Sequence, residues 1–257
     1  MNHIPRKRFG QHFLVDQHYI QRIVEAIRPE RHQRIVEIGP GLAAITAPLL
    51  ARLDHLHVVE IDRDIVAHLQ SSYAPGKLTI HAVDALQFDF GQLGHELRIV
   101  GNLPYNISSP LLFYLAEFSE HITDMTFMLQ KEVVDRMVAA PGGGDYGRLS
   151  VMLQCRFAME RLFVVPPGAF QPPPKVDSAI VHLIPLPADA KRPMDQARFA
   201  QVVASGFSQR RKTIRNTLKP WLGEADFAAL EIDPQLRAEN LSVDDFMRIA
   251  DHSIRRA

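Results

Sequence analysis

The sequence predicts an α/β fold, a mainly parallel β-sheet flanked by helices, followed by a small all-helical domain. Short apolar runs alternate with helical patterns from residue 35 to about residue 153, which is typical of βαβ units. Two longer alternating runs, 156–165 and 179–186, suit an antiparallel pair at the edge of such a sheet. After Pro185 and Pro187 the pattern is helical.

The individual elements follow from apolar runs that end at Gly, Pro, Asn or Asp and from apolar residues spaced three and four apart. The expected strands cover 35–39, 57–61, 78–83, 98–102 and 125–130. The expected helices cover 42–52, 63–72, 108–119, 131–139 and 148–153, and a final helix begins at Ser242 as N-cap. A domain boundary near residue 188 separates a catalytic domain, 1–187 with a basic arm at 1–16, from a helical domain, 188–257, with Trp221 in its core.

Composition narrows the class of protein. The 257 residues are 46% hydrophobic and 23% charged, as in ordinary globular proteins. Cys155 is the only cysteine, which excludes an internal disulfide and a cysteine-based zinc site. No apolar run approaches the length of a membrane span, and no apolar segment follows the basic start as in a secretory signal. We expect a cytoplasmic monomer that binds neither metal nor membrane.

Charge is unevenly distributed although the formal net charge is zero. Residues 1–34 hold seven Lys/Arg and three acids (+4), residues 35–187 hold ten and sixteen (−6), and residues 188–257 hold twelve and ten (+2). The tightest basic cluster is Arg210, Arg211 and Lys212, with Arg215 expected on the same helix face as Arg211. A solvated helix face is the alternative, but the neighbouring Asn216 and Lys219 and the basic stretch 6–8 favour phosphate binding.

The first strand runs into a turn with Gly39 and Gly41, where the backbone can approach a ligand. The next two strands end near acids: Glu60 can accept from both hydroxyls of a ribose, and Asp84 from an adenine amino group. Gly39, Gly41 and Ala44 also fit a loose dinucleotide pattern, so NAD stays open. Because Pro40 removes an N–H that would hold a pyrophosphate, a cofactor without phosphates, S-adenosylmethionine, fits better.

The segment 102–106, Asn-Leu-Pro-Tyr-Asn, follows another strand end. It offers the Asn102 amide oxygen, the Pro104 carbonyl and the Tyr105 ring, which suit a planar base with an exocyclic amine. An ordinary turn is the alternative. Phe170 lies in a proline-rich loop, 166–174, with no obvious core to join, so we expect it to form a second stacking surface opposite Tyr105.

The chain resembles the KsgA-type dimethyltransferases, which modify adenines of small-subunit ribosomal RNA. The resemblance rests on five ordered blocks: 8–14 (RFGQHFL), 37–41 (EIGPG), 102–106 (NLPYN), 170–178 (FQPPPKVDS) and 208–213 (SQRRKT). One departure is His12, which stands where many members have Asn and leaves the geometry of that cofactor contact open. The resemblance implies a Rossmann-like S-adenosylmethionine-dependent methyltransferase sheet with a small helical C-terminal domain.

The resemblance also implies a set of site residues. Cofactor contacts fall on His12, Leu14, Gly39, Gly41, Glu60, Asp84 and Asn102. Catalytic contacts fall on Asn102, Pro104, Tyr105 and Phe170, and RNA contacts on Arg210, Arg211, Lys212 and Arg215. The implied reaction is dimethylation of the N6 amines of two adjacent adenines near the 3′ end of 16S rRNA, with a small-subunit precursor as partner. A ribosome-assembly binding factor and a DNA adenine methyltransferase stay open as alternatives.

Overall fold

The computed structural model describes residues 12–105 and 107–255, and the chain divides into two compact units. The first, here called the sheet unit, runs to Val134 and includes Met159–Pro185; the second, the helical unit, combines Asp135–Ala158 with the chain from Leu186 onward. The second change of unit, at Leu186, is close to the boundary expected near residue 188. Residues 135–158 differ from the expected division because Val151 and Cys155 share a hydrophobic core with the C-terminal helices.

The sheet unit contains the strands and the first helices. Its strands are β1 (Phe13–Leu14), β2 (Arg34–Ile38), β3 (Leu56–Val59), β4 (Leu78–His81), β5 (Leu97–Asn102), β6 (Ile122–Gln130), most of β7 (Phe157–Val165), β8 (Phe170–Gln171) and β9 (Ser178–Pro185). Its helices are α1 (Gln17–Ile27), α2 (Thr46–Leu50), α3 (Arg63–Ser72), α4 (Ser108–Leu115), the start of α5 (Lys131–Val138), and the 3₁₀ helices η2 (Phe90–Leu93), η3 (Ala116–His121) and η4 (Pro167–Ala169).

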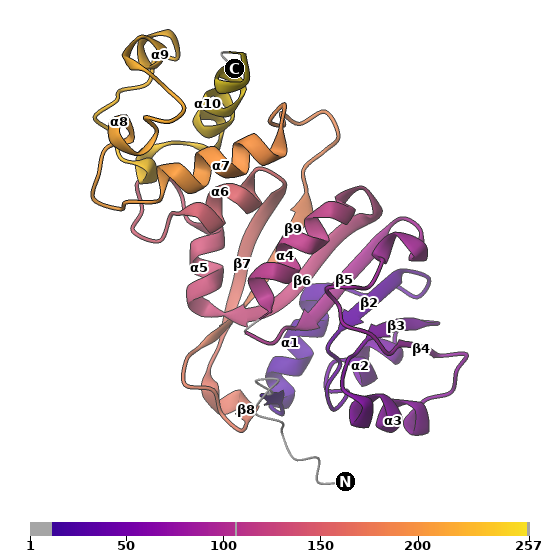
Figure 1. The fold of residues 1–257 in the computed structure, drawn as a ribbon. Helices are drawn as coiled ribbons and strands as arrows, with labels where there is room; N and C mark the ends of the chain where they lie inside the picture. The colour runs from indigo at the N-terminus through magenta and orange to yellow at the C-terminus, as the bar shows by residue number, and fades with distance from the viewer. Residues whose placement is uncertain (1–11, 106, 256–257) are drawn as a thin grey trace. The chain divides into compact units, whose positions relative to one another are not determined.

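Seven of these strands form a sheet in the order β4-β3-β2-β5-β6-β9-β7 (Figure 1), and β1 pairs with β8 in a separate two-stranded sheet. The neighbouring pairs from β4 to β6 are parallel, and β9 is antiparallel to β6. The expected α/β fold is therefore confirmed. The expected helix 63–72 coincides with α3, whereas the helix expected over 42–52 is limited to Thr46–Leu50, and α1 was not among the expected elements.

One hydrophobic cluster covers a face of the sheet. Its helical members come from α1, α2 and α3 and include Ile23, Leu49 and Leu69, which pack with Ile35 and Val58 of the strands. The helix α4 buries leucines of its own outside that cluster, and Figure 1 shows it on the other face. Because helices cover both faces of the sheet, polar groups can contact a ligand only at the ends of the strands.

Strands β2 and β5 approach each other closely at Gly101. A Cβ at Gly101 would lie 2.4 Å from the carbonyl oxygen of Ile38, so no larger residue fits without a backbone shift. This close approach brings the turn after β2 next to the end of β5.

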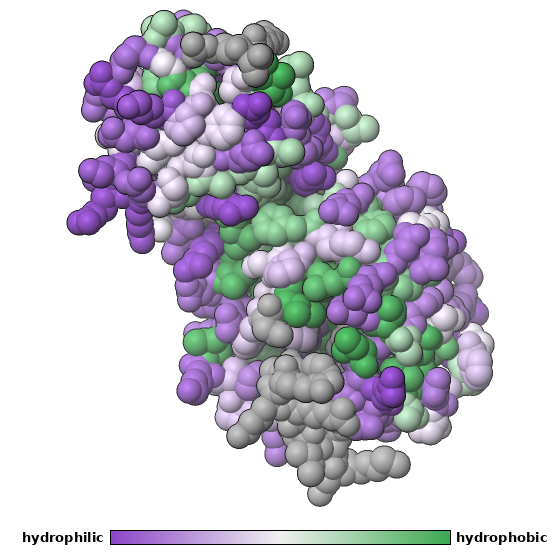
Figure 2. All heavy atoms as spheres, in the orientation of Figure 1, coloured by the Kyte–Doolittle hydropathy of each residue, from purple (hydrophilic) through white to green (hydrophobic). Residues whose placement is uncertain are grey.

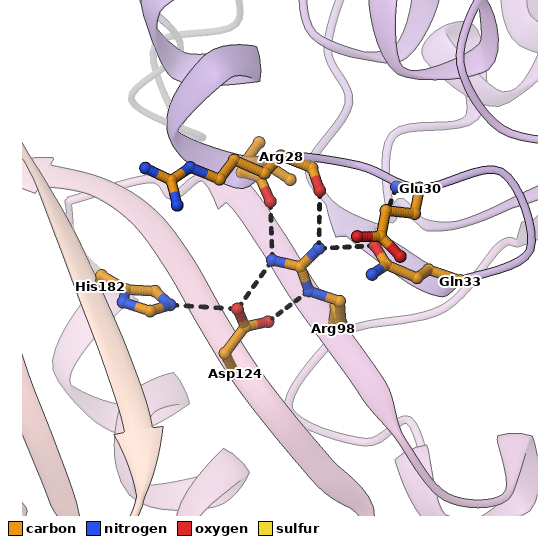
Figure 3. A network of polar contacts seen from close by, with 7 residues as sticks. Arg28, Glu30, Gln33, Arg98, Asp124 and His182 are labelled. Carbon is orange, nitrogen blue, oxygen red and sulfur yellow. Dashed lines mark hydrogen bonds and ion pairs between the residues drawn. The ribbon is translucent and has the colours of Figure 1, made fainter.

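The amino edge of the sheet carries a network of charged groups (Figure 3). Arg98 makes two hydrogen bonds of 2.8 Å to the Asp124 carboxylate, and the side chains of both residues are 13% exposed. The same guanidinium donates to the carbonyls of Ile27 and Arg28 at the end of α1, and His182 Nε2 lies 3.1 Å from Asp124. The network therefore ties α1, β5, β6 and β9 together.

The helical unit contains the rest of α5, α6 (Arg148–Gln154), α7 (Gln196–Gly206), α8 (Ile214–Thr217), α9 (Glu224–Ala229), the 3₁₀ helix η5 (Ala238–Asn240) and α10 (Val243–Arg255). Its core includes Phe199, Leu218 and Phe246, with Trp221 partly buried against it. The expected N-cap is confirmed, because Ser242 Oγ accepts from the backbone N–H of Asp245 at 3.1 Å.

Candidate functional site

A cavity of about 340 Å³ lies at the carboxyl ends of β2, β3 and β5, a size within the range of small-molecule sites. Most of the predicted site residues line it: His12, Leu14, Gly39, Gly41, Glu60, Asp84, Asn102, Pro104 and Tyr105. The structure thus brings together segments that are widely separated in the sequence, as the strand order requires.

The turn after β2 lines this cavity. Gly39 and Gly41 have φ values of +68° and +53°, a conformation that costs other residues energy. The Gly39 N–H donates to the Val59 carbonyl at 3.0 Å, which fixes the turn against β3. These angles agree with the Gly-rich turn that the sequence predicts after the first strand.

Glu60 follows β3 and is 8% exposed. Burial raises the pKa of its carboxyl group, while backbone N–H groups of Asp62, Ile61 and Gly41 act in the opposite direction. Asp84 accepts from the Leu86 N–H through Oδ1 at 3.0 Å, which orients its carboxylate at the cavity. Both acids can therefore offer fixed acceptor oxygens to hydroxyl or amino groups of a ligand.

The Asn102 amide is oriented by the N-terminal segment. Its Nδ2 donates to the backbone carbonyl of His12 at 3.2 Å; because a carbonyl only accepts, this bond assigns the nitrogen and leaves Oδ1 as the acceptor. The Pro104 carbonyl accepts from the Ile107 N–H at 3.2 Å and keeps a second lone pair. Two acceptors at the end of β5 match the two N–H groups of an exocyclic amine.

Tyr105 lies beside these acceptors. Its ring centroid is 6.0 Å from that of His12 with 28° between the planes, and its hydroxyl is 2.8 Å from Ser178 Oγ. Burial raises the pKa of Tyr105, so the phenol is neutral at ordinary pH.

Glu37 was not predicted as a site residue, although it lines the same cavity. It is 1% exposed and its Oε2 accepts from the Thr46 hydroxyl at 2.7 Å. Burial, partly offset by the Thr46 hydrogen bond, raises its pKa to about 7, and the nearby Glu60 adds to the rise. A carboxylate inside the apolar run Val36-Glu37-Ile38 is the sequence signal that could have identified it.

Phe170 does not lie where the sequence suggested. It is 4% exposed and belongs to the hydrophobic cluster of the sheet unit, because β8 pairs with β1 and places Phe170 opposite Leu14. The expectation that Phe170 has no core to join was therefore wrong. Its stacking role stays a prediction, and it would require the ring to leave this packed position.

The four predicted RNA contacts are exposed residues of the helical unit, around α8, where Figure 2 shows hydrophilic side chains. The expected helix face shared by Arg211 and Arg215 was wrong, because α8 begins only at Ile214. The N–H groups of Ile214 and Arg215 donate to the carbonyls of Leu236 and Pro234, and these bonds fix the start of the helix there. Arg215 Nε also lies 2.5 Å from Glu224 Oε1.

Some expectations fall outside the described residues: the basic stretch Arg6-Lys7-Arg8 of the arm, and Asn106. Within residues 12–105 and 107–255, there is no group of three or more His, Cys, Asp or Glu side chains that could hold a metal ion. In the same residues, none of the helices combines the length and apolar character needed to cross a membrane.

Comparison with known proteins gives a full-length match. The family model for ribosomal RNA adenine dimethylase matches residues 2–254. The ribosomal RNA small subunit methyltransferase A of Aromatoleum aromaticum is 62% identical over 250 residues, which cover 97% of this chain and 94% of the relative. The same-named protein of Thiobacillus denitrificans is 62% identical over 247 residues, 96% of this chain and 97% of the relative.

Solved structures agree with this fold. A dimethyladenosine transferase from Plasmodium falciparum superimposes with a TM-score of 0.78 at 25% identity, over 93% of this chain and 96% of the other. The 23S rRNA methyltransferase ErmE has a TM-score of 0.72 at 24% identity, over 93% of this chain and 98% of that chain. The latter likeness concerns the fold alone.

Proposed function

The chain belongs to the ribosomal RNA adenine dimethylase family, and from this premise we propose that it dimethylates the N6 amines of two adjacent adenines near the 3′ end of small-subunit rRNA during subunit biogenesis. The methyl donor is S-adenosylmethionine. The observation that carries the proposal is the pairing of the Asn102 amide oxygen and the Pro104 carbonyl beside Tyr105, in one cavity with Glu60 and Asp84.

The cavity fits this cofactor. Glu60 would hold the ribose hydroxyls and Asp84 the adenine amino group, while His12 and Leu14 would contact it from the N-terminal segment. The Gly39-Pro40-Gly41 turn approaches the cavity with no side chain on either glycine. When bound, the cofactor supplies an electrophilic methyl group on a sulfonium.

The chain's own residues would activate the amine by positioning it. The exocyclic nitrogen of adenine is a poor nucleophile because its lone pair is delocalised into the ring. By accepting both N–H groups, Asn102 Oδ1 and the Pro104 carbonyl favour a pyramidal nitrogen with an available lone pair. No strong base is needed, because the methylated amine is acidic and loses its proton to solvent, so orientation and electrostatics provide most of the rate effect. Tyr105 would stack on the base once it has left its stack in the RNA.

Selection of two adenines in a large RNA requires a wider surface than this cavity. We assign this role to Arg210, Arg211, Lys212 and Arg215, which would contact phosphates. Replacing Arg211 and Arg215 with Glu should weaken binding to small subunits and flatten its salt dependence, with cofactor affinity unchanged. As a control, Arg52→Glu changes the charge of an exposed residue in the sheet unit and should leave binding close to normal.

The test of the function is transfer of radiolabelled methyl groups to small ribosomal subunits that lack the modification. We expect two methyl groups on each of two adjacent adenines, and far less transfer to naked RNA or DNA. Efficient transfer to DNA would favour a DNA adenine methyltransferase, and subunit binding without transfer would favour a pure assembly factor. Either result would contradict the proposal.

A further inference from the structure

The hydroxyl of Tyr105 is held by a residue 73 positions later in the chain. Its Oη lies 2.8 Å from the Oγ of Ser178, which is fully buried as the first residue of β9. Ser178 lies opposite Gln130 of β6 in the sheet. The backbone carbonyl of the preceding residue, Asp177, accepts a hydrogen bond from the Lys131 N–H. The partner of the Tyr105 hydroxyl is therefore fixed by a regular strand and not by a loop alone.

The same segment also holds the N-terminal side of the cavity. His12 Nδ1 lies 2.8 Å from the Pro172 carbonyl, and because a carbonyl only accepts, Nδ1 carries the proton. The His12 ring stacks beside Tyr105, and its backbone carbonyl accepts from Asn102. Three segments, 12–14, 102–105 and 170–178, are thus connected in a closed series of contacts around the acceptors for the amine.

A hydroxyl tether has a specific effect on a tyrosine ring. Rotation about the Cβ–Cγ bond of an aromatic side chain is only weakly restricted by its own torsional preference. The hydroxyl oxygen lies on the axis of this rotation, so fixing its position restricts the tilt of the axis and not the rotation itself. Because the phenolic O–H and the lone pairs used in hydrogen bonds lie near the plane of the ring, a hydrogen bond to a fixed partner also favours one orientation of that plane. A base that stacks on such a ring meets a surface already in position, so less freedom is lost when the base arrives.

We propose that Ser178 is a positioning residue for methyl transfer: its hydroxyl fixes the plane of Tyr105 in readiness for the target adenine. This proposal rests on the proposed function, in which Tyr105 stacks on the base. Since the adenine leaves its stack after the subunit has docked, a poorly held ring slows turnover and leaves the KM for subunits unchanged.

The experiment compares Ser178→Ala, Tyr105→Phe and the double variant on subunits lacking the modification. Each single change removes the same hydrogen bond and should lower kcat about 3- to 10-fold. The double variant should lose no more than either single variant, while KM and cofactor affinity stay at wild-type values. Tyr114→Phe is the matched control, because the Tyr114 hydroxyl donates to the Phe88 carbonyl at 3.2 Å and its loss should leave kcat unchanged.

A second readout does not depend on activity. In protein labelled with 3-fluorotyrosine, the five tyrosines give separate ¹⁹F signals, and Tyr105→Phe identifies the one from Tyr105. Ser178→Ala should shift and broaden that signal and leave the Tyr114 signal in place.

The outcomes separate the two proposals. If the wild-type protein is active, three results would overturn the positioning role alone. They are normal turnover in Ser178→Ala, losses that multiply in the double variant, and a Tyr105 signal that Ser178→Ala leaves unchanged. Wild-type protein that transfers no methyl groups to small subunits overturns the proposed function, and the positioning role with it.

Discussion

The two edges of the same sheet both hold buried charged groups, but they satisfy them differently. At the amino edge, the Arg98 guanidinium donates to the Asp124 carboxylate and to neighbouring backbone carbonyls. At the carboxyl edge, the acids Glu37 and Glu60 line the same cavity as Asn102, whose side-chain acceptor is Oδ1. Buried charges that have partners within the protein depend on those partners for the stability of the fold, whereas acceptors that line a cavity are available to a ligand.

The buried acids of the two edges also affect the stability of the protein in opposite directions as the pH changes. The hydrogen bonds and charges of Arg98 and His182 lower the pKa of Asp124 despite its burial. This contribution to stability is present above the unfolded pKa and is lost as the pH falls through the folded pKa. Burial raises the pKa of Glu37 to about 7, so Glu37 destabilises the folded protein increasingly as the pH rises from about 4.5 to 7. A lower pH therefore reduces the stability that Asp124 contributes at the amino edge and removes the destabilisation that Glu37 causes at the carboxyl edge.

The largest expected effect belongs to the carboxyl edge. Asn102→Ala removes an acceptor for the reacting amine and should lower turnover about 100- to 1000-fold, the size found when one oriented polar group is removed from an active site. Single-turnover assays measure the loss. Within residues 12–105 and 107–255, the Asn102 side chain makes one hydrogen bond, to the His12 carbonyl, so thermal unfolding should change little. A variant with wild-type turnover would remove Asn102 from the mechanism.

The amino edge should give the opposite pattern. Arg98→Ala removes the main partner of the buried Asp124 carboxylate. The free energy of unfolding, measured with urea, should therefore fall by about 3 kcal/mol. Turnover of the protein that remains folded should stay normal. Arg34→Ala is the matched control, since this exposed arginine of the same edge makes a hydrogen bond to the His95 carbonyl and should cost far less. If Arg98→Ala and Arg34→Ala lowered the free energy of unfolding equally, the distinction between the two edges would be contradicted.

A smaller effect tests ligand binding at the carboxyl edge. Glu60→Ala removes the acceptor proposed for the ribose hydroxyls and should weaken S-adenosylmethionine binding by about 2 kcal/mol, or about 30-fold, in calorimetry. Glu25→Ala removes an exposed acid from α1 and should leave the affinity unchanged. Binding of NAD in place of S-adenosylmethionine would overturn the assignment of the cofactor.

The smallest expected effect concerns pH. Between pH 5 and 7 the cofactor-free protein should lose about 1–2 kcal/mol of stability through Glu37, because the unfolded chain releases this proton more readily than the folded one. In Glu37→Gln, which keeps an acceptor for Thr46, denaturation at the two pH values should differ less. An identical pH dependence in both proteins would show that Glu37 is charged in the folded state.

The strand ends could be predicted because each one is marked by neighbouring residues in the sequence. Apolar runs that stop at Gly39, Glu60, Asp84 or Asn102 placed these residues at one edge, as parallel strands must, and the structure lines one cavity with them. The contacts that escaped prediction depend on pairing between distant segments. Phe170 joins a core only because β8 pairs with β1, 156 positions or more away along the chain.

Two other differences have physical reasons of the same kind. The carbonyls of Leu236 and Pro234 fix the start of α8, so the spacing of Arg211 and Arg215 alone could not define a helix. The partner of Tyr105 is set by the place of β9 in the sheet and cannot be read from residues around Tyr105.

The position of β9 between β6 and β7 has a consequence for synthesis on the ribosome. The parallel strands β2 to β6 leave the ribosome first, and β6 is largely buried in the finished sheet. Until β9 emerges, β6 is an unpaired apolar edge, a surface on which chaperones or other chains can act. Ser178 comes into contact with Tyr105 only when β9 pairs with β6. A nascent chain that ends before residue 178 can therefore form the Gly39-Pro40-Gly41 turn, but it lacks the hydrogen bond that holds the Tyr105 ring for the base.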